Sequence, residues 1–385
     1  MIISRVRLTV AAAACLLFLF PSCRTSEISP NDPAVRYWDE LSRFLAGMPL
    51  PVESVYSKHT GTPQYRAHAA YMDDFWQRVN DETLTRLNPW RAGNVKKIKG
   101  DVAFYPLSGA DFINLYSIYP DCGKYFMIAL EESGNIPEPL KQSPDKVHAL
   151  LASIRRTVYH YGAFNYFQSK VMTAEMCTVS KTGNAPALMV FMARLGLKVA
   201  RVEPVGIDPD GTIVPLDKDG RIWGSTPATR GMRYVFFTED DRTPRTLVYL
   251  DMRLDADTID PATASGKFFQ KLDRVKTIMK SAVYLLHMMG FEAVRDLVIS
   301  KSAMIVQDDS GIPYANLNNG EWDITLFGSY WPIYPITGCT VRNQEDLAAG
   351  FRKGALPLPF NFGYGSLLGK NKSNLIMAVR KKGKR

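Results

Sequence analysis

Histidine is scarce in this sequence, with five residues among 385. The five lie far apart, and no two of them have the spacing of a zinc-binding motif. His287 stands in an apolar stretch, which is typical of a histidine buried in a core. No pattern for a bound cofactor is present either, so the sequence predicts neither a metal nor a cofactor.

Cysteine is equally rare, and its five residues do not form a disulfide framework. Cys15 belongs to an N-terminal leader and Cys23 directly follows it, which leaves three cysteines in the body of the chain. Because three is an odd number, at most one bridge forms there. Cys177 lies in an apolar helical run and is expected as a buried thiol. Cys122 and Cys339, each beside a glycine, are the one pair that we would test for a bridge.

Basic charge is not spread along the chain as nucleic-acid binding requires. The formal net charge is +9, but Arg5 and Arg7 are in the leader and five basic residues are among the last six. The rest of the chain therefore carries about +2. A nucleic-acid-binding protein places its lysines and arginines along one face or groove. We expect no nucleic-acid partner, and we interpret the C-terminal cluster as a solvated end, with anionic lipid headgroups as the alternative contact.

The first 22 residues have the pattern of a secretory signal peptide. Arg5 and Arg7 form a positively charged start, and residues 8–20 are almost entirely apolar. As a helix, this apolar run would be about 20 Å long, which is too short for a hydrocarbon core of about 30 Å. The leader is therefore expected to direct export.

A small residue directly before a cysteine ends this leader. The stretch Phe20-Pro21-Ser22-Cys23 resembles a bacterial lipobox. The resemblance implies cleavage before Cys23, its lipidation, and, because Arg24 is not an aspartate-type retention signal, a lipid anchor in the cell outer membrane. Ordinary secretion and an uncleaved anchor are the alternatives. The expected organisation is a signal peptide at 1–22, a lipidated cysteine and tether at 23–31, a helical N-terminal segment at 32–98 and an α+β body at 99–385.

Helix signals dominate the segment 32–98. An Asp-Pro pair at 32–33 and a Thr-Pro pair at 62–63 each have the pattern of a helix N-cap with proline in the first turn. Apolar residues then recur at steps of three and four, which predicts helices that end near Gly47 and Val79. Pro89 disfavours a helical conformation at the residue before it, so the helical opening is expected to end there.

The body contains blocks of strand signals and blocks of helix signals. A run at 267–289 has apolar residues at four- and three-residue steps and is predicted as a long helix. Because strands and helices come in blocks, the sequence predicts an α+β fold rather than a doubly wound sheet. The expected architecture is a helical N-terminal segment followed by a mixed, mainly antiparallel sheet with helices packed on it. The predicted strands are 102–107, 125–130, 198–205, 212–216, 221–224, 232–238, 246–254, 304–307, 322–330 and 375–380.

Two Asp-x-Asp-Gly stretches, at 208–211 and 217–220, carry carboxylates of the kind that bind calcium. An EF-hand loop also needs an acid two residues earlier and a glutamate at its twelfth position. The first stretch has Gly206 and Asp217 at those places, and the second lacks both ligands. Aspartate and glycine are also the residues that tight turns between strands prefer. We therefore interpret both stretches as hairpin turns.

The candidate for catalysis or cation binding is Asp308-Asp309, in the segment 308–314. Two adjacent carboxylates after a strand can bind a cation or act as acid and base, because the charge of one raises the pKa of the other. The alternative is a solvated turn. Aromatic residues follow closely, and flat rings beside polar groups suit sugars and peptides. The candidate ligand-binding residues are Trp322, Tyr330, Trp331 and Tyr334, with burial in the core as the alternative for about half of the aromatics in this region.

Several stretches of the body resemble a family of uncharacterised exported bacterial lipoproteins. They are the sequences at 104–109, 125–137, 284–287, 308–314, 327–330 and 358–360. Together with the lipobox, this resemblance implies a lipid-anchored cell-envelope protein that binds a ligand or partner, such as a glycan or a protein of the envelope. The alternative is a hydrolase or transferase that acts on envelope polysaccharide or peptide material, with Asp308 and Asp309 as its catalytic residues.

Overall fold

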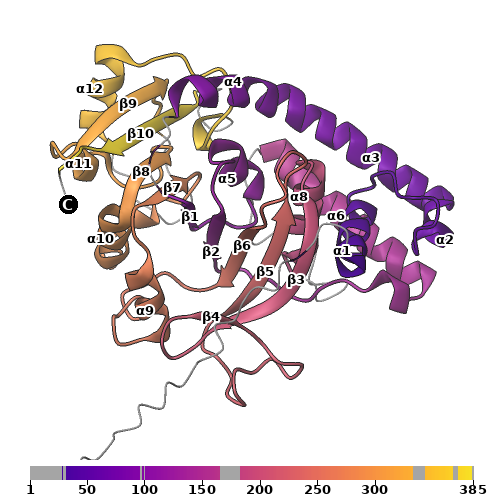
Figure 1. Cartoon of the computed structure of the whole chain (residues 1–385). Helices are drawn as coiled ribbons and strands as arrows, with labels where there is room; N and C mark the ends of the chain where they lie inside the picture. The colour runs from indigo at the N-terminus through magenta and orange to yellow at the C-terminus, as the bar shows by residue number, and fades with distance from the viewer. Residues whose placement is uncertain are drawn as a thin grey trace, which may run out of the picture.

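The two predicted opening helices are confirmed as α1 (Pro33–Leu45) and α3 (Pro63–Val79), with a short α2 (Ser57–Thr60) before the latter (Figure 1). The structure is a computed structural model that describes residues 28, 32–95, 98, 100–164, 183–332, 343–366 and 372–383. Both caps are as predicted. The Asp32 carboxylate accepts a hydrogen bond from the backbone two residues later, and the Thr62 hydroxyl accepts one from the backbone three residues later.

The helical opening does not end before Pro89, which lies inside α4 (Thr85–Asn94). A π-helical turn, η1 (Asn80–Leu84), joins α3 to α4 and changes the hydrogen-bond register shortly before the proline. Leu87 and Trp90 are buried, and the Trp90 ring packs edge-on against two phenylalanines of the body. Burying two such side chains contributes about 1.5–3 kcal/mol each, which offsets a proline penalty of about 3 kcal/mol.

The described part of the body forms a sheet of ten strands in the order β4-β3-β5-β6-β2-β1-β7-β8-β10-β9. Five of its nine neighbouring pairs are antiparallel and four are parallel. With helices packed on this mixed sheet after a helical N-terminal segment, the chain has the predicted α+β fold. The strands are β1 (Val102–Pro106), β2 (Lys124–Ala129), β3 (Lys198–Ile207), β4 (Ile213–Pro215), β5 (Arg230–Phe237), β6 (Arg245–Asp251), β7 (Val275–Met279), β8 (Ser302–Gln307), β9 (Trp322–Gly328) and β10 (Asn374–Arg380).

The predicted long helix at 267–289 is wrong. That stretch contains the end of α9 (Ala264–Lys271), then β7, then a 3-10 turn, η3 (Leu285–His287). Arg274, with φ +52°, breaks the chain direction between α9 and β7. Because β7 is covered on both faces, its apolar residues show no alternation and fall at intervals that imitate a helix.

The middle of the sheet has a different organisation from its ends. From β6 through β2, β1 and β7 to β8, all neighbours are parallel. Numbered along the chain, these strands and β9 have the order 3-2-1-4-5-6 of a doubly wound sheet, with the antiparallel β10 inserted before the last. The chain passes from β1 to β2 on one side and from β7 to β8 on the other, so a topological switch point lies between β1 and β7. In such sheets, ligands bind beyond the carboxyl ends of the strands.

Helices cover both faces of this sheet. One core cluster unites α1, α3, α5, α6 and α8 with one face, and a second unites α9 and α10 with the other face. In Figure 1, α9 and α10 lie at the lower left, away from α3 and α6 at the right. Among the described residues, no helix combines the length and the hydrophobicity needed to cross a bilayer. The remaining helices are α5 (Phe112–Ile118), η2 (Pro139–Lys141), α6 (Pro144–Phe164), α8 (Ala185–Arg194), α10 (Glu292–Lys301), α11 (Tyr314–Leu317), α12 (Glu345–Gly354) and η4 (Tyr364–Ser366).

Candidate functional site at the carboxyl ends of the strands

Asp308 and Asp309 follow β8 directly and are buried, with 0% and 1% of their surfaces exposed. The interpretation as a solvated turn is therefore wrong. One oxygen of Asp308 accepts hydrogen bonds from the Ser310 hydroxyl at 2.5 Å and the Ser310 N–H at 3.2 Å. The other oxygen accepts from the backbone N–H groups of Ser281 and Tyr364, each at 3.2 Å. The carboxylate thus ties together three segments that are distant in the sequence.

Asp309 is also held by donors of the chain itself. Its carboxylate accepts hydrogen bonds from the Tyr284 hydroxyl at 2.8 Å and the Asn374 amide at 2.9 Å. Burial raises the pKa of both adjacent carboxyls, and the charge of Asp308 raises the pKa of Asp309 further. Every oxygen of the two carboxylates already accepts at least one hydrogen bond, so the pair has the geometry of a structural element.

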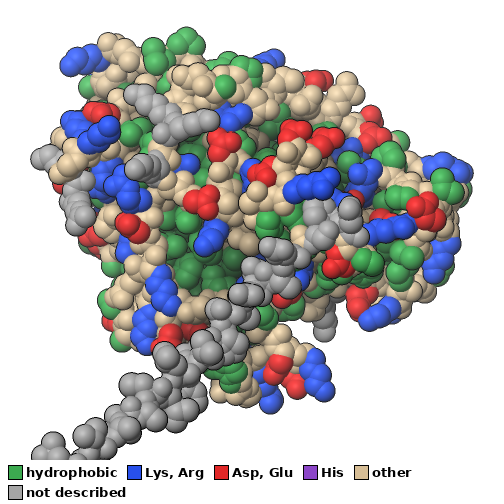
Figure 2. Space-filling view, in the orientation of Figure 1, with side chains coloured by type: hydrophobic (Ala, Val, Ile, Leu, Met, Phe, Trp, Pro, Cys, Tyr) green, Lys and Arg blue, Asp and Glu red, His purple; other side chains and the backbone are tan. Residues whose placement is uncertain are grey.

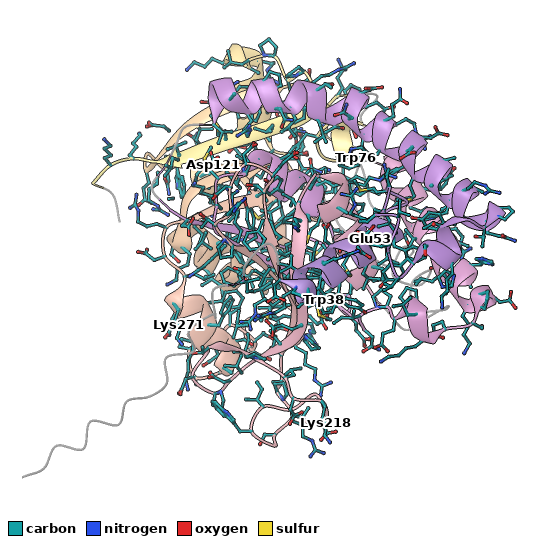
Figure 3. The ribbon with its side chains drawn as sticks, turned by 45° about the vertical axis from the view of Figure 1, so that its right-hand side comes forward. Trp38, Glu53, Trp76, Asp121, Lys218 and Lys271 are labelled. Atoms are coloured by element: carbon teal, nitrogen blue, oxygen red, sulfur yellow. The ribbon has the colours of Figure 1, made fainter. Side chains whose placement is uncertain are left out.

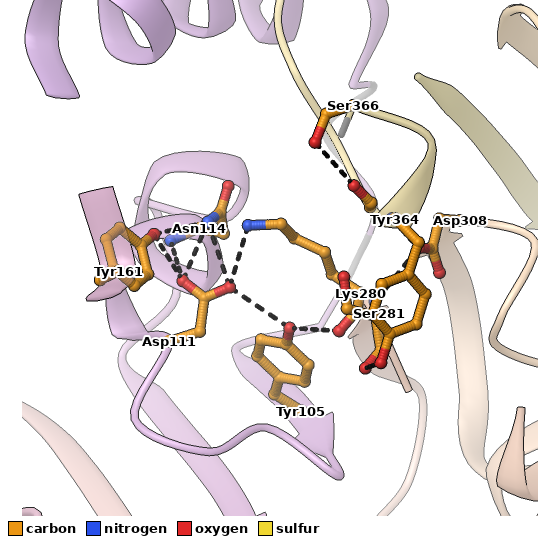
Figure 4. A network of polar contacts seen from close by, with 10 residues as sticks. Tyr105, Asp111, Asn114, Tyr161, Lys280, Ser281, Asp308, Tyr364 and Ser366 are labelled. Carbon is orange, nitrogen blue, oxygen red and sulfur yellow. Dashed lines mark hydrogen bonds and ion pairs between the residues drawn. The ribbon is translucent and has the colours of Figure 1, made fainter. Parts of the chain in front are cut away.

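A buried ion pair lies beside these acids (Figure 4). Lys280 follows β7 directly, and its ammonium lies 3.4 Å from a carboxylate oxygen of Asp111, the N-cap residue of α5. Asp111 also accepts hydrogen bonds from the Asn114 amide at 2.9 Å, the Tyr161 hydroxyl at 3.0 Å and the Tyr105 hydroxyl at 3.4 Å. The two charged side chains are 0% and 2% exposed. Burial lowers the pKa of Lys280, and the Asp111 charge opposes that change.

The ion pair occupies the switch point between β1 and β7. This is the place where a doubly wound sheet usually holds the phosphates of a nucleotide, on a Gly-x-Gly-x-x-Gly turn. Here the turn at 107–111 reads Leu-Ser-Gly-Ala-Asp, and the acidic Asp111 stands at the start of the helix that would face a phosphate. In the described part of the chain, the switch point is therefore a closed polar core that disfavours a phosphate.

The loop after β7 has a strained backbone. Ser281, Val283 and Tyr284 have φ values of +54°, +55° and +54°, in the left-handed region that residues other than glycine rarely adopt. Each such residue costs on the order of 1–2 kcal/mol. The hydrogen bond from the Ser281 N–H to Asp308 holds this loop in place. Asp308 therefore helps to fix the loop that positions Lys280.

The candidate ligand-binding aromatics do not form one surface. Trp322 is buried at the end of β9 that is about 20 Å from the end beside the acids, with its ring 4.3 Å from the Arg380 guanidinium carbon. Tyr330 lines a separate cavity of about 370 Å³ between β9 and α12. Trp331 follows it in the chain and is 46% exposed.

Several residues named from the sequence lie outside the described residues. They are Cys23, Cys177, Tyr334 and Cys339. Cys122 is a free, buried thiol, and burial raises its pKa to about 11. His287 lies in η3, and burial lowers its pKa to about 4, so it is neutral at physiological pH.

A larger cavity, of about 970 Å³, opens at the carboxyl ends of β2 and β6. Its walls come from the loop at 132–136 after β2, from Asp251 at the end of β6, and from the hairpin segments 216–220 and 227–232. Figure 3 shows Lys218 on the part of this hairpin region that projects from the body. The cavity lies beyond the carboxyl ends of the parallel strands, on the same side of the sheet as the switch point but over β2 and β6, and its size is that of a small-molecule site.

Among the titratable residues that line this cavity, Asp251 has the clearest shift in pKa. Its two oxygens accept hydrogen bonds from the Ser133 N–H at 2.7 Å and the Ser133 hydroxyl at 3.1 Å. Burial raises the pKa of Asp251 to about 7, and the charges of Glu132 and Glu131 act in the same direction. A carboxyl with a pKa near neutrality, in the wall of a cavity, has the property expected of a group that recognises a ligand or transfers a proton.

Replacing Asp251 with asparagine is expected to remove a pH dependence of stability. Folding raises the pKa of Asp251 from 3.8 to about 7, so between these values the folded chain binds more protons than the unfolded chain. The free energy of unfolding of the parent should therefore fall as the pH rises from about 4 to about 7, by on the order of 1–3 kcal/mol. Asparagine cannot ionise, so the variant should lack this contribution and be more stable than the parent above pH 7.

Urea denaturation at about pH 5 and about pH 8 measures this difference. The exposed Asp257, replaced by asparagine, is the matched control and should keep the slope of the parent. An Asp251→Asn variant with the same pH slope as the parent would show that the carboxyl is not perturbed.

The two Asp-x-Asp-Gly stretches are turns, as predicted. One oxygen of Asp208 accepts hydrogen bonds from the N–H groups of Asp210 and Thr212, at 3.0 and 2.8 Å. Asp217 accepts two hydrogen bonds from its own turn in the same pattern. These carboxylates serve the turns in which they stand. Across the described ranges, no group of three or more histidine, cysteine or acidic side chains is placed to hold a metal ion.

Comparison with protein-family models, with curated proteins and with solved structures finds no match to the chain. The geometry of the chain's own residues is therefore what bears on its function. The residues that carry that geometry and that no sequence motif singles out are Asp111, Ser133, Asp251 and Lys280. The weak signal for Asp251 is its place at the end of an apolar strand.

Proposed function

We propose that the protein is an exported cell-envelope protein, anchored by a lipid at Cys23, that binds a small hydroxyl-rich ligand such as an envelope saccharide. The observation that carries the ligand-binding part is the cavity of about 970 Å³ at the carboxyl ends of β2 and β6. It lies on the side of the sheet where the parallel strands have their carboxyl ends, which is the side on which doubly wound sheets bind ligands, and it has the volume of a small-molecule site.

The lining of the cavity supports a neutral polar ligand. Four acids and two bases line it, and no ion pair joins any of them to another described residue. A sugar hydroxyl donates to a carboxylate and accepts from an ammonium or guanidinium group, so one class of ligand satisfies both signs of charge. The four acids are Glu132, Asp217, Asp219 and Asp251, and the two bases are Lys218 and Arg230.

The proposal includes no nucleic-acid partner. On the face drawn in Figure 2, lysine and arginine side chains are interspersed with aspartate and glutamate and do not line up in a stripe. A nucleic-acid surface needs such a stripe or patch.

The alternative function is hydrolysis or group transfer on envelope material. One observation favours it, because a pKa of about 7 suits Asp251 to general acid or base catalysis. The adjacent pair Asp308 and Asp309 supports it less, since both residues are fully buried, whereas Asp251 lies in the wall of a cavity. Binding without turnover is therefore the function that we propose first.

Calorimetric titration with a panel of peptidoglycan disaccharides, neutral oligosaccharides and peptides tests the proposal. We expect a saccharide to bind and to be recovered unchanged. Asp251→Asn should weaken its binding at least about tenfold, because one hydrogen-bonded, partly buried carboxylate contributes on the order of 1.5–3 kcal/mol. Asp257→Asn should bind like the parent. Recovery of a cleaved saccharide would establish the enzymatic alternative, and no binding across the panel would reject the ligand class.

Replacing Cys23 with serine is expected to abolish lipid labelling of the protein. A lipid is transferred to a thiol, and serine offers none, so the signal should stay uncleaved or be cleaved elsewhere. Growth with a labelled fatty acid, followed by recovery of the protein, measures this. Cys122→Ser, which changes a buried thiol, is the control and should keep the label. Undiminished labelling of the Cys23→Ser variant would reject the anchor.

A further inference from the structure

The projecting segment between β4 and β5 contains a two-residue turn with a tryptophan at its tip. Ile222 and Ser225 exchange backbone hydrogen bonds of 2.8 and 2.9 Å across the turn. Trp223 and Gly224 stand between them with φ values of +48° and +84°, and positive φ at both central residues is what a type I′ turn requires. Ile222 is 6% exposed and fixes the turn to the body, whereas Trp223 is 78% exposed.

Trp223 is a poor residue for the stability of this turn. Type I′ turns prefer Asn-Gly or Asp-Gly, because short polar side chains tolerate a positive φ and bulky ones do not. With 78% of its surface exposed, the indole buries little apolar area to offset the strain. Strained backbone of this kind concentrates at functional positions. A contact between the Trp223 side chain and another molecule would explain why a tryptophan stands at this strained and exposed position.

We propose that Trp223 inserts into the headgroup region of a lipid bilayer and gives the protein a second membrane contact. Tryptophan concentrates at this level of a membrane, because its apolar body and its polar N–H match the two sides of the interface. Within the loop, Lys218 and Arg221 are balanced by Asp217 and Asp219. The contact is therefore made by the indole and does not depend on anionic lipid.

A lipid surface fits this loop better than a protein partner. A stable protein interface buries about 800 Å² on each side around its central aromatic residues. The exposed residues that follow Trp223 are Gly224, Ser225 and Thr226, which supply no such apolar surround. The segment between β4 and β5 projects from the body (Figures 1 and 3). A single exposed ring on such a segment can enter the headgroup layer alone. The inference rests on the proposed anchor in one respect, since the anchor would hold the loop near the bilayer and raise its effective concentration there.

Fluorescence quenching by brominated lipid tests this contact. The full chain is incorporated into phosphatidylcholine vesicles whose acyl chains carry bromine close to the headgroups, and its tryptophan emission is compared with that in unbrominated vesicles. Trp223→Ala is expected to lose most of the quenching. Trp331→Ala removes another exposed tryptophan and should keep it. Adding phosphatidylglycerol, or about 0.5 M salt, should change the quenching little, because the charges of the loop balance.

A folding control comes from the turn itself. Because asparagine suits a type I′ turn, Trp223→Asn should melt at or above the temperature of the parent and still lose the quenching. Undiminished quenching in Trp223→Ala overturns the proposal, as does quenching that disappears in high salt. An unquenched parent that carries its lipid also overturns it and makes a protein partner the explanation of the loop. Lipid labelling of Cys23 and saccharide titration are separate measurements, so a failure of the anchor or of the cavity is distinguished from a failure of the loop.

Discussion

Replacing Asp111 with asparagine is expected to lower the free energy of unfolding by about 3–5 kcal/mol, because it leaves the charge of Lys280 buried without a counter-ion. The Lys280 side chain is 0% exposed, and among the described residues Asp111 is the carboxylate in ion-pair contact with it. Asparagine keeps the size of aspartate and its capping oxygen, so the packing and the start of α5 are retained. Urea denaturation measures the loss.

Two controls separate the ion pair from general damage. Adding Lys280→Met to Asp111→Asn removes the stranded charge and should recover part of the stability. Burial lowers the pKa of Lys280 below its value of 10.5, so the folded state accommodates the neutral lysine better than the charged one. The single variant should therefore regain stability as the pH rises from neutrality toward that value. A single variant as stable as the parent would contradict a structural role of the pair.

Asp308→Asn is expected to destabilise the fold by about 2–4 kcal/mol. The carboxylate accepts four hydrogen bonds, shared between its two oxygens. Asparagine offers one oxygen, so the donors on one side, either Ser310 or the pair Ser281 and Tyr364, would face an amide N–H. Part of the loss is recovered because asparagine removes a buried charge that burial already disfavours, as the raised pKa of Asp308 indicates.

Thermal and urea denaturation measure this variant beside Asp296→Asn, which changes an exposed acid on α10. Asp296→Asn should stay within about 0.5 kcal/mol of the parent. If Asp308→Asn were equally harmless or stabilising, its carboxylate would be free to act in a site, and the structural role assigned to it here would be wrong.

The opening helices follow from the sequence because their determinants are local. The caps at Asp32 and Thr62 act within three residues, and the apolar spacing of α1 and α3 reflects burial on one face. Pro89 fails as a boundary because its effect is also local, whereas the burial of Leu87 and Trp90 depends on the sheet. Tertiary packing outweighs the proline there.

β7 could not be recognised by the same reasoning. A strand covered on both faces loses the two-residue alternation that marks a half-buried strand, so its apolar residues read as part of a helix. For the same reason the sequence does not identify Lys280 as a candidate site residue, because its position at the carboxyl end of a central strand is known only once β7 is recognised. Its partner Asp111 is 169 residues away in the sequence, and no local pattern joins them.

The environment of the candidate acids also depends on residues that are far away in the sequence. Two carboxylates after β8 are visible in the sequence, but their burial depends on donors as distant as Tyr364, 56 residues further along the chain. No motif marks Asp251. Its pKa is raised by burial and by the charges of Glu132 and Glu131, which the fold brings to the end of β6 from more than a hundred residues earlier in the sequence. A sequence can indicate an acid at the end of a strand, but only the fold shows whether that acid lies in the wall of a cavity or is fully buried.

The measurement that tests the proposed function most directly is a calorimetric titration of one bound peptidoglycan disaccharide into the parent, Asp251→Asn and Asp308→Asn, at a temperature at which all three are folded. The two variants distinguish the open cavity from the closed polar core at the switch point. We predict that Asp251→Asn weakens binding at least about tenfold, while Asp308→Asn binds like the parent. Unchanged binding by Asp251→Asn together with lost binding by Asp308→Asn would contradict the assignment of the ligand to the cavity.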